Sequence, residues 1–266
     1  MKILIIGGGN MGKTYADSFT ANHTVAKENL YILDHQPKKV EYFKSQGFEN
    51  SFSQPSSYIY EMNLIILAIK PQDAALLHPT VLPYLKAKQL VLSIMAGVTM
   101  QRLEDALPQA RIIRAMPNLP AQIGMGITGF TAAQQVTREE LFMVQNLLNT
   151  TGKSIYFEDE NKLDAVTAIS GSGPAYVYYF MDAMMNTARK MGFTTTEAEL
   201  LVEQTFMGAV HLQSIHTLSC KDWIAKVASK GGTTEAAIKT FNHFGIDTNI
   251  EKGLQQALQR AKELGS

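Results

Sequence analysis

A glycine cluster directly after the first apolar run constrains the fold of this chain most strongly. The segment Gly7–Gly12 fits the pattern G-x-G-x-x-G, follows the apolar run Ile3–Ile6 and opens a helical stretch. In that setting Gly7 allows a tight turn, Gly9 lets the backbone approach a pyrophosphate, and Gly12 lets the helix pack closely on the strand. The helix N-terminus then offers N–H groups to phosphates. We expect a dinucleotide-binding unit; the alternative is a glycine-rich turn without a ligand.

Strand-like and helix-like stretches alternate through the rest of the first half. Several of the strand-like runs are apolar throughout, as expected for parallel strands that are covered on both faces. Strands are predicted at 3–6, 30–33, 64–69, 90–94, 111–113 and 153–157, and helices at 10–21, 37–46, 72–83, 99–106 and 137–149. This alternation predicts a Rossmann-type doubly wound α/β sheet.

After Glu158 the pattern is helical only, which predicts two domains: a dinucleotide-binding domain over 1–158 and an all-α domain over 159–266. The stretch Ala175–Met191 is apolar on nearly every side. A domain of about 110 residues has little room to bury such a helix alone, so a subunit interface is expected. A central core helix stays open as the alternative.

Asp34 ends the second predicted strand, 22 residues after Gly12. An acidic side chain at this place accepts hydrogen bonds from the adenosine ribose and favours NADH over NADPH. His35, Lys38 and Lys39 follow and could offset the repulsion of a 2′-phosphate. The alternative is an Asp that only caps the next helix.

Charge and composition exclude several other classes. Lys plus Arg is 24 and Asp plus Glu is 24, so there is no basic excess for a nucleic-acid backbone. Cys220 is the single cysteine, which excludes an intramolecular disulfide and fits a reducing compartment. The apolar run Leu64–Ile69 is far shorter than a membrane span. We expect a soluble cytoplasmic protein that binds neither nucleic acid nor membrane.

Three strand exits and one loop carry further candidate residues. Lys70-Pro71, Ala96-Gly97 and Met116-Pro117-Asn118 follow strands, where open α/β sheets bind ligands. Ordinary loops and an Asx-type turn at Asn118 are the alternatives. In Ser229–Thr234 two glycines and two threonines precede a helical run. They form an anion nest suited to a carboxylate, or a simple N-cap.

Five segments together resemble the pyrroline-5-carboxylate reductase family, in family order from residue 3 to about 240. They are 68–71, 96–99, 114–120 (Arg-Ala-Met-Pro-Asn-Leu-Pro), 165–176 (Ala-Val-Thr-Ala-Ile-Ser-Gly-Ser-Gly-Pro-Ala-Tyr) and 229–234 (Ser-Lys-Gly-Gly-Thr-Thr). The resemblance implies a Rossmann domain, a helical dimerisation domain that builds a homodimer or larger homo-oligomer, and an active site between them. Lys230 stands where the family usually has proline, so a less rigid loop is expected.

The resemblance also implies a reaction: reduction of the cyclic imine L-1-pyrroline-5-carboxylate to L-proline by NADPH or NADH. Thr234 is the candidate catalytic residue, as a hydrogen-bond partner of the imine nitrogen or the carboxylate. The candidate substrate-binding residues are Ser229, Gly231, Gly232, Thr233 and Thr234. The candidate cofactor-binding residues are Gly7, Gly9, Asn10, Met11, Gly12, Asp34, Ala68, Lys70, Pro71, Ala96, Gly97, Met116, Pro117 and Asn118.

No metal site and no catalytic histidine is expected, because the six histidines are scattered. Two alternative functions stay open. A β-hydroxyacid dehydrogenase-like oxidoreductase shares the expected layout but needs a strong base or a lysine. A non-catalytic dinucleotide-binding regulator has no need of an intact loop, whereas Gly231–Thr234 is intact.

Overall fold

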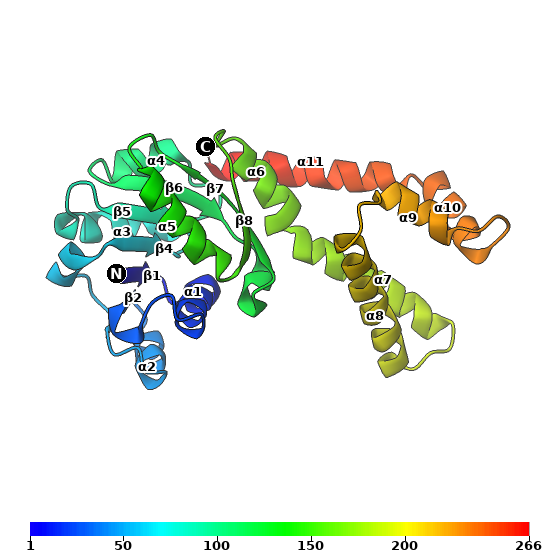
Figure 1. The fold of residues 1–266 in the computed structure, drawn as a ribbon, viewed down its shortest axis with the longest axis horizontal. Helices are drawn as coiled ribbons and strands as arrows, with labels where there is room; N and C mark the ends of the chain where they lie inside the picture. Colours follow the sequence, from blue (N-terminus) through cyan, green and yellow to red (C-terminus); the bar gives the residue numbers. More distant parts are fainter. Residues whose placement is uncertain (266) are drawn as a thin grey trace. The chain divides into compact units, whose positions relative to one another are not determined.

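The computed structural model describes residues 1–265 and divides into two compact units (Figure 1). The first unit is built on an eight-stranded sheet in the order β3-β2-β1-β4-β5-β6-β7-β8. Neighbouring strands are parallel, except that β6 and β7 are antiparallel. The strands are β1 (Ile3–Ile6), β2 (Leu30–Leu33), β3 (Ser51–Phe52), β4 (Leu64–Leu67), β5 (Leu90–Ser93), β6 (Arg111–Met116), β7 (Gly126–Ala132) and β8 (Gly152–Tyr156).

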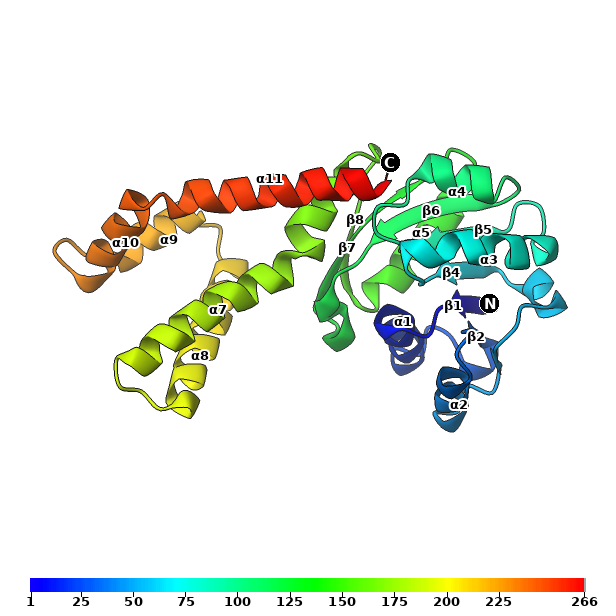
Figure 2. The same cartoon turned by 180° about the vertical axis from the view of Figure 1, so that it is seen from behind.

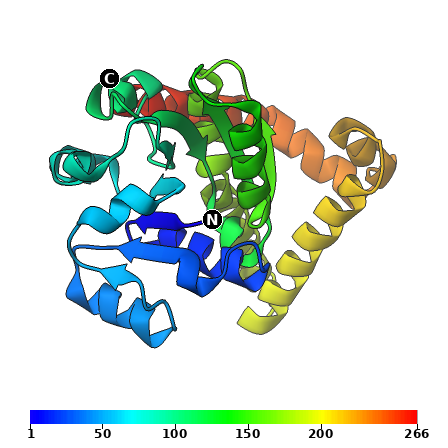
Figure 3. The same ribbon diagram turned by 60° about the vertical axis from the view of Figure 1, so that its left-hand side comes forward.

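Both faces of the sheet are covered, which explains the apolar runs. Alternate residues of β1 enter different cores: Ile3 and Ile5 pack on one face, and Leu4 and Ile6 on the other. The first core includes side chains of α1 (Asn10–Ala21) and α5 (Arg138–Asn149). The second includes side chains of α3 (Ala74–Val81) and α4 (Met100–Ala106). Figure 3 shows these helices flanking the strands, together with α2 (Pro37–Ser45). The predicted doubly wound fold is confirmed.

The helix ends follow local capping chemistry. Thr99 caps α4 by accepting a hydrogen bond from the Arg102 N–H at 3.3 Å. Thr137 and Glu140 form a capping box at the start of α5. The helices expected at 10–21, 99–106 and 137–149 therefore agree with the structure to within one residue. The helix expected at 72–83 is shorter, because 3₁₀ turns over Pro71–Asp73 and Leu82–Tyr84 flank α3.

The second unit, Pro174–Gln256, is entirely helical (Figure 2). Its helices are α7 (Gly173–Lys190), α8 (Thr195–Ser214), α9 (Cys220–Val227), α10 (Thr233–His243) and the first part of α11 (Ile246–Gly265). Within this unit, whose residues are all described, only Ala198 and Val202 are buried. Because α7 has no buried residue, the alternative that Ala175–Met191 is a core helix of its own chain is wrong.

The limits of the units differ from the boundary expected at 158/159. The first unit extends to Gly173 and takes in the chain again from Ala257 onward. Helix α6 (Lys162–Val166) belongs to this unit because Leu163 is fully buried and Asp164 pairs with Arg114 of β6. Ala261 of α11 is also buried. The helical part of the sequence therefore begins before Pro174, where the second compact unit begins.

Neither a membrane-spanning helix nor a metal-binding cluster is found in residues 1–265. None of the helices there combines the length and hydropathy that crossing a bilayer requires. No group of three or more His, Cys, Asp or Glu residues there, the side chains of 75–78 left aside, is arranged to hold a metal ion. Cys220 is a free, exposed cysteine.

Candidate active site

The turn between β1 and α1 depends on two glycines. Gly7 has a φ of +106°, and its N–H donates to the Leu33 carbonyl at 2.8 Å. A Cβ placed on Gly7 would lie 2.6 Å from the Ala68 carbonyl oxygen, and one placed on Gly12 would lie 1.9 Å from the Gly7 carbonyl oxygen. Any side chain at either position would collide with backbone, which agrees with the tight turn and close packing expected from the sequence.

Gly9 differs from those two glycines because it faces open space. It is the N-cap of α1, and no atom lies within 4 Å of a Cβ placed on it. No side chain caps the helix, and its first turn has no acidic residue. The N–H groups at the start of α1, from Asn10 to Gly12, have no partner within the helix and carry the positive end of its dipole. The loop therefore has both the room and the donors that a pyrophosphate needs.

Asp34 holds the glycine loop from the neighbouring strand. Its side chain is only 3% exposed. Its Oδ2 accepts hydrogen bonds from the Gly8 N–H at 2.8 Å and from Lys39 Nζ at 3.0 Å, while its Oδ1 accepts from the Gln36 N–H at 2.9 Å. The carboxylate is thus engaged by three internal donors, including one just before α2. Its expected contact with a ribose stays a prediction.

The other cofactor candidates of the first unit follow three adjacent parallel strands. Ala68, Lys70 and Pro71 follow β4, Ala96 and Gly97 follow β5, and Met116, Pro117 and Asn118 end or follow β6. Since β1, β4, β5 and β6 are parallel neighbours, their carboxyl ends share one edge of the sheet with the glycine loop. Gly97 is not open there: a Cβ placed on it would lie 2.8 Å from Leu264 Cβ of α11.

Asn118 links two of the segments that the sequence singled out. Its Oδ1 accepts a hydrogen bond from the Ile127 N–H at 2.9 Å, and its Nδ2 donates to the Ser170 carbonyl at 3.2 Å. Ser170 lies in a single π-helical turn over Thr167–Gly171, a form often found at functional sites. A Cβ placed on Gly171 would lie 2.6 Å from Met116 Cε. The segments 114–120 and 165–176 are therefore in direct contact.

Arg114 of β6 forms ion pairs with residues close to the start of α6, and no role was predicted for it from the sequence. It is 3% exposed, and its guanidinium pairs with Glu160 at 2.5 Å and with Asp164 at 3.3 Å. Glu160 also accepts a hydrogen bond from the Met100 N–H at 2.6 Å, at the start of α4. The signal in the sequence is an arginine between apolar residues inside β6, with two carboxylates about 50 residues later.

The candidate substrate loop, Ser229–Thr234, lies in the second compact unit, before and at the start of α10. Gly231 has a φ of +76°, and its N–H donates to the Glu235 carboxylate at 2.7 Å. The Gly232 N–H donates to the Ser229 carbonyl at 3.0 Å. Thr233 and Thr234 form the first turn of α10. Glu235 of α10 therefore contacts the loop directly, a contact that was not predicted from the sequence.

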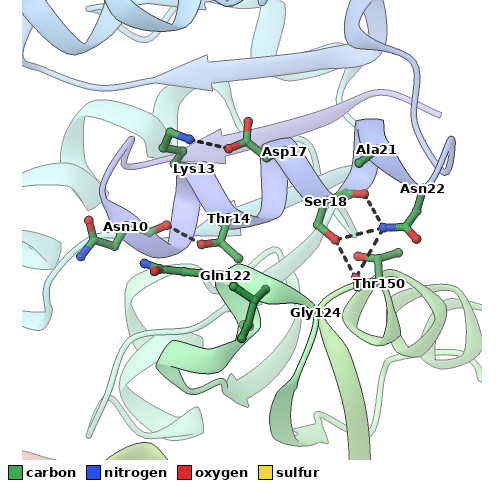
Figure 4. Close-up of a pocket in the computed structure, with 12 residues that line it drawn as sticks. Asn10, Lys13, Thr14, Asp17, Ser18, Ala21, Asn22, Gln122, Gly124 and Thr150 are labelled. Atoms are coloured by element: carbon green, nitrogen blue, oxygen red, sulfur yellow. Dashed lines mark hydrogen bonds and ion pairs between the residues drawn. The ribbon is translucent and has the colours of Figure 1, made fainter. Parts of the chain in front are cut away.

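A polar cavity lies beside α1 in the first unit (Figure 4). Its volume is about 600 Å³, and it lies between one side of α1 and the 3₁₀ turn Leu119–Ile123. Lys13 and Asp17 in its lining pair with each other at 2.6 Å, and Ser18 donates to the Thr150 carbonyl at 2.7 Å. Of the cofactor candidates, only Asn10 lines this cavity.

Known proteins match this chain along its whole length. Residues 160–264 match the family model of pyrroline-5-carboxylate reductase dimerisation, and residues 2–97 match that of NADP oxidoreductase coenzyme F420-dependent. The pyrroline-5-carboxylate reductase of Pseudomonas aeruginosa is 33% identical, over 99% of this chain and 96% of its own.

Two solved structures are similar as well. A pyrroline-5-carboxylate reductase from Coxiella burnetii is 31% identical and superposes with a TM-score of 0.91, over 100% of this chain and 98% of its own. A Plasmodium falciparum pyrroline carboxylate reductase with NADP bound is 25% identical, with a TM-score of 0.90 over 100% of this chain and 98% of its own. The glycine loop, the strand exits and the intact Gly231–Thr234 loop thus lie in a chain that belongs to the pyrroline-5-carboxylate reductase family.

Proposed function

We propose that this chain reduces L-1-pyrroline-5-carboxylate to L-proline with NADPH or NADH. The observation that carries the proposal is the family match over 99% of the chain, with its glycine loop and its Gly231–Thr234 loop both intact. The relatives are named for this reaction, and one solved relative has NADP bound. The reaction adds a hydride to the imine carbon and a proton to the imine nitrogen.

The glycine loop is the proposed holder of the cofactor. The open space at Gly9 and the free first turn of α1 support a pyrophosphate at Asn10, Met11 and Gly12. Nicotinamide bound at the shared edge of β4, β5 and β6 would supply the hydride. Small residues such as Ala68 and Ala96 leave room at that edge. The chain contributes position and electrostatics to this reaction.

The loop before α10 is the proposed holder of the substrate. The first-turn N–H groups of Thr233 and Thr234 have no partner within the helix, so they suit the substrate carboxylate. The Thr234 hydroxyl is the proposed hydrogen-bond partner of the imine nitrogen. A threonine hydroxyl is too weak an acid to protonate the imine, so solvent or a preformed iminium supplies the proton.

Association through the helical region is part of the proposal. The family model that matches 160–264 is a dimerisation domain, and the second unit leaves most of its apolar side chains uncovered. A homodimer or a larger homo-oligomer, built through these helices, would cover them.

The two alternatives are less well supported. A β-hydroxyacid dehydrogenase needs a base for an alcohol proton, and the curated relatives that match almost the full chain are named pyrroline-5-carboxylate reductases. A non-catalytic regulator does not explain the intact loop.

An assay of NADPH and NADH oxidation tests the proposal. The purified protein should consume NADPH or NADH when L-1-pyrroline-5-carboxylate is offered, and should not form NADPH or NADH when a β-hydroxyacid is offered with the oxidised cofactors. Formation of L-proline in proportion to the cofactor consumed is the second readout. Activity with the β-hydroxyacid alone, or with neither substrate, would reject the proposal.

A further inference from the structure

The Glu235 side chain binds a backbone N–H of the loop that is proposed to hold the substrate carboxylate. It is the third residue of α10, and its Oε2 accepts the Gly231 N–H at 2.7 Å. Its Oε1 pairs with Lys239 Nζ at 3.1 Å, one helical turn further on. The hydrogen bond from Gly231 and, to a lesser degree, Lys239 lower the pKa of Glu235, so this carboxylate is charged at neutral pH.

This contact differs from the capping boxes elsewhere in the chain. In α5, α8 and α9 a hydroxyl side chain caps the helix, and the acidic residue three positions later accepts the N–H of that same N-cap. Helix α10 has Gly232 as its N-cap, which has no side chain. The Gly232 N–H is already taken by the Ser229 carbonyl, and Glu235 reaches one residue further back, to Gly231.

The contact determines which donors are left for a ligand. Gly231 is in the left-handed region, with a φ of +76°, and glycine has more conformational freedom to lose than any other residue. Glu235 holds that conformation by binding the Gly231 N–H. The nest expected from the sequence is therefore partly filled by the chain's own carboxylate, and the donors that remain are those of the first turn of α10.

We infer that Glu235 is a positioning residue of the substrate loop: it holds Gly231 so that the substrate carboxylate meets the N–H groups of Thr233 and Thr234. The inference rests on the proposed function. Lys239 has a matching role, because its charge offsets that of Glu235 close to where an anionic substrate binds. Glu235 touches the loop and not the reacting atoms, so its effect depends on whether a substrate uses the loop.

Two substrates and three variants test this inference. Glu235→Ala should raise the KM for L-1-pyrroline-5-carboxylate by about five- to tenfold, the effect of losing one hydrogen bond to a charged group in a partly exposed site. It should leave the KM for 1-pyrroline, which lacks the carboxylate, unchanged. Glu235→Gln keeps an acceptor for Gly231 and should retain most of the wild-type KM. Glu197→Ala removes the corresponding acid from the capping box of α8 and should change neither KM.

Two readouts independent of turnover complete the test. NADPH titration should give the wild-type affinity for every variant. Hydrogen exchange at the Gly231 amide should be faster in Glu235→Ala than in the wild type. Equal losses on both imines, an unchanged KM, or a KM that falls because Glu235 competes with substrate would each overturn the inference while the wild-type activity stands. A wild type that reduces neither imine would reject the proposed function, and the inference with it.

Discussion

The two compact units differ in how much of their apolar surface each buries by itself. In the first unit, every residue of β1, β4 and β5 is buried. In the second unit, over the fully described range Pro174–Gln256, only Ala198 and Val202 are buried. The first unit builds its own core on two faces of a sheet, whereas the second unit lacks one within a single chain.

This difference separates what each unit contributes. Exposed apolar side chains of the second unit include Tyr179 at 75%, Phe244 at 68% and Val210 at 67%. So much uncovered apolar surface marks a protein–protein contact. The nucleotide loop lies in a unit that builds its own core, and we expect the helical unit to depend on association.

The largest effect is expected from the ion pairs of the buried Arg114 in the first unit. Arg114→Ala would leave Glu160 and Asp164 without their cation in a site where Arg114 is 3% exposed. We expect a loss of about 3 kcal/mol in the free energy of unfolding, at the lower end of the range for removing one partner of a buried pair, because the two carboxylates left behind are partly exposed. Urea unfolding followed by circular dichroism measures it.

An exposed pair provides the control for Arg114. Arg260 pairs with Glu263 in α11, and its side chain is 67% exposed. Arg260→Ala should cost about 0–1 kcal/mol. Equal losses for the two variants would show that the burial of Arg114 does not determine its contribution.

Tyr179 tests the dependence of the second unit on association. Tyr179→Glu would place a charge on the exposed apolar side of α7, so that association would bury an unpaired carboxylate. We expect the dissociation constant of the subunits to increase by about 100-fold or more, equivalent to about 2.7 kcal/mol in the free energy of association. Phe142→Glu, which alters a side chain in α5 that is 65% exposed, should leave association unchanged. Light scattering over a concentration series distinguishes them, and a wild-type monomer at micromolar concentration would contradict the interface.

Gly9 tests the nucleotide loop without disturbing its unit. No atom lies within 4 Å of a Cβ placed there, so Gly9→Val should fold and associate normally. The new side chain would fill the space where a pyrophosphate approaches, and affinity for NADPH and NADH should fall by about 100-fold, again about 2.7 kcal/mol. Fluorescence titration with both cofactors measures this. Wild-type affinity would remove the glycine loop from the proposed cofactor site.

Much of the first unit could be predicted because its signals are local. The runs 3–6 and 30–33 coincide with β1 and β2, since continuous apolar runs are typical of buried parallel strands. Strand β7 was missed because Gly126 and Gly129 weaken its strand pattern. A glycine is needed at position 129 because of a tertiary contact: a Cβ placed there would lie 2.8 Å from the side chain of Val166 in α6. That approach cannot be inferred from neighbouring residues.

The candidate site shows the same limit. The sequence identified the glycine loop and the Ser229–Thr234 loop because glycine spacing and helix starts are local features. It did not show that Asp34 binds the Gly8 N–H or that Glu235 binds the Gly231 N–H. Both contacts depend on the direction in which one backbone N–H points. A carboxylate near a glycine loop is equally compatible with a ligand contact and an internal one.

Thr234 tests the contribution of the second unit to the reaction. Thr234→Ala should lower kcat/KM for the imine by about tenfold, the effect of one neutral hydrogen bond, while NADPH affinity stays near that of the wild type. Thr234→Ser should keep most of the activity because the hydroxyl survives. Steady-state kinetics paired with cofactor titration measures both. If Thr234→Ala is as active as the wild type, the residue serves only to begin α10; if it loses NADPH affinity, the proposed division of roles between the units is wrong.

The smallest effect is expected at Asp34, where one carboxylate connects the glycine loop to Lys39. Asp34→Ser would remove the acceptor of the Gly8 N–H at 2.8 Å and release Lys39, whose Nζ is now 3.0 Å from Oδ2. A released lysine attracts the 2′-phosphate of NADPH, whereas loss of the carboxylate removes an acceptor for the ribose of NADH. The ratio of NADPH to NADH efficiency should therefore rise by about three- to tenfold.

Two comparisons separate the causes of that shift. In Lys39→Ala the carboxylate remains without its cation, so efficiency with NADPH should fall while efficiency with NADH changes little. Dissociation constants from direct titration show whether binding accounts for the change. If Asp34→Ser weakens the binding of NADPH and NADH equally, Asp34 acts by accepting the Gly8 N–H and does not determine the preference between the two cofactors. If the wild type strongly prefers NADPH and Asp34→Ser has the same preference, Asp34 does not determine cofactor choice. In that case neither the charge of Asp34 nor its ion pair with Lys39 affects binding at the ribose.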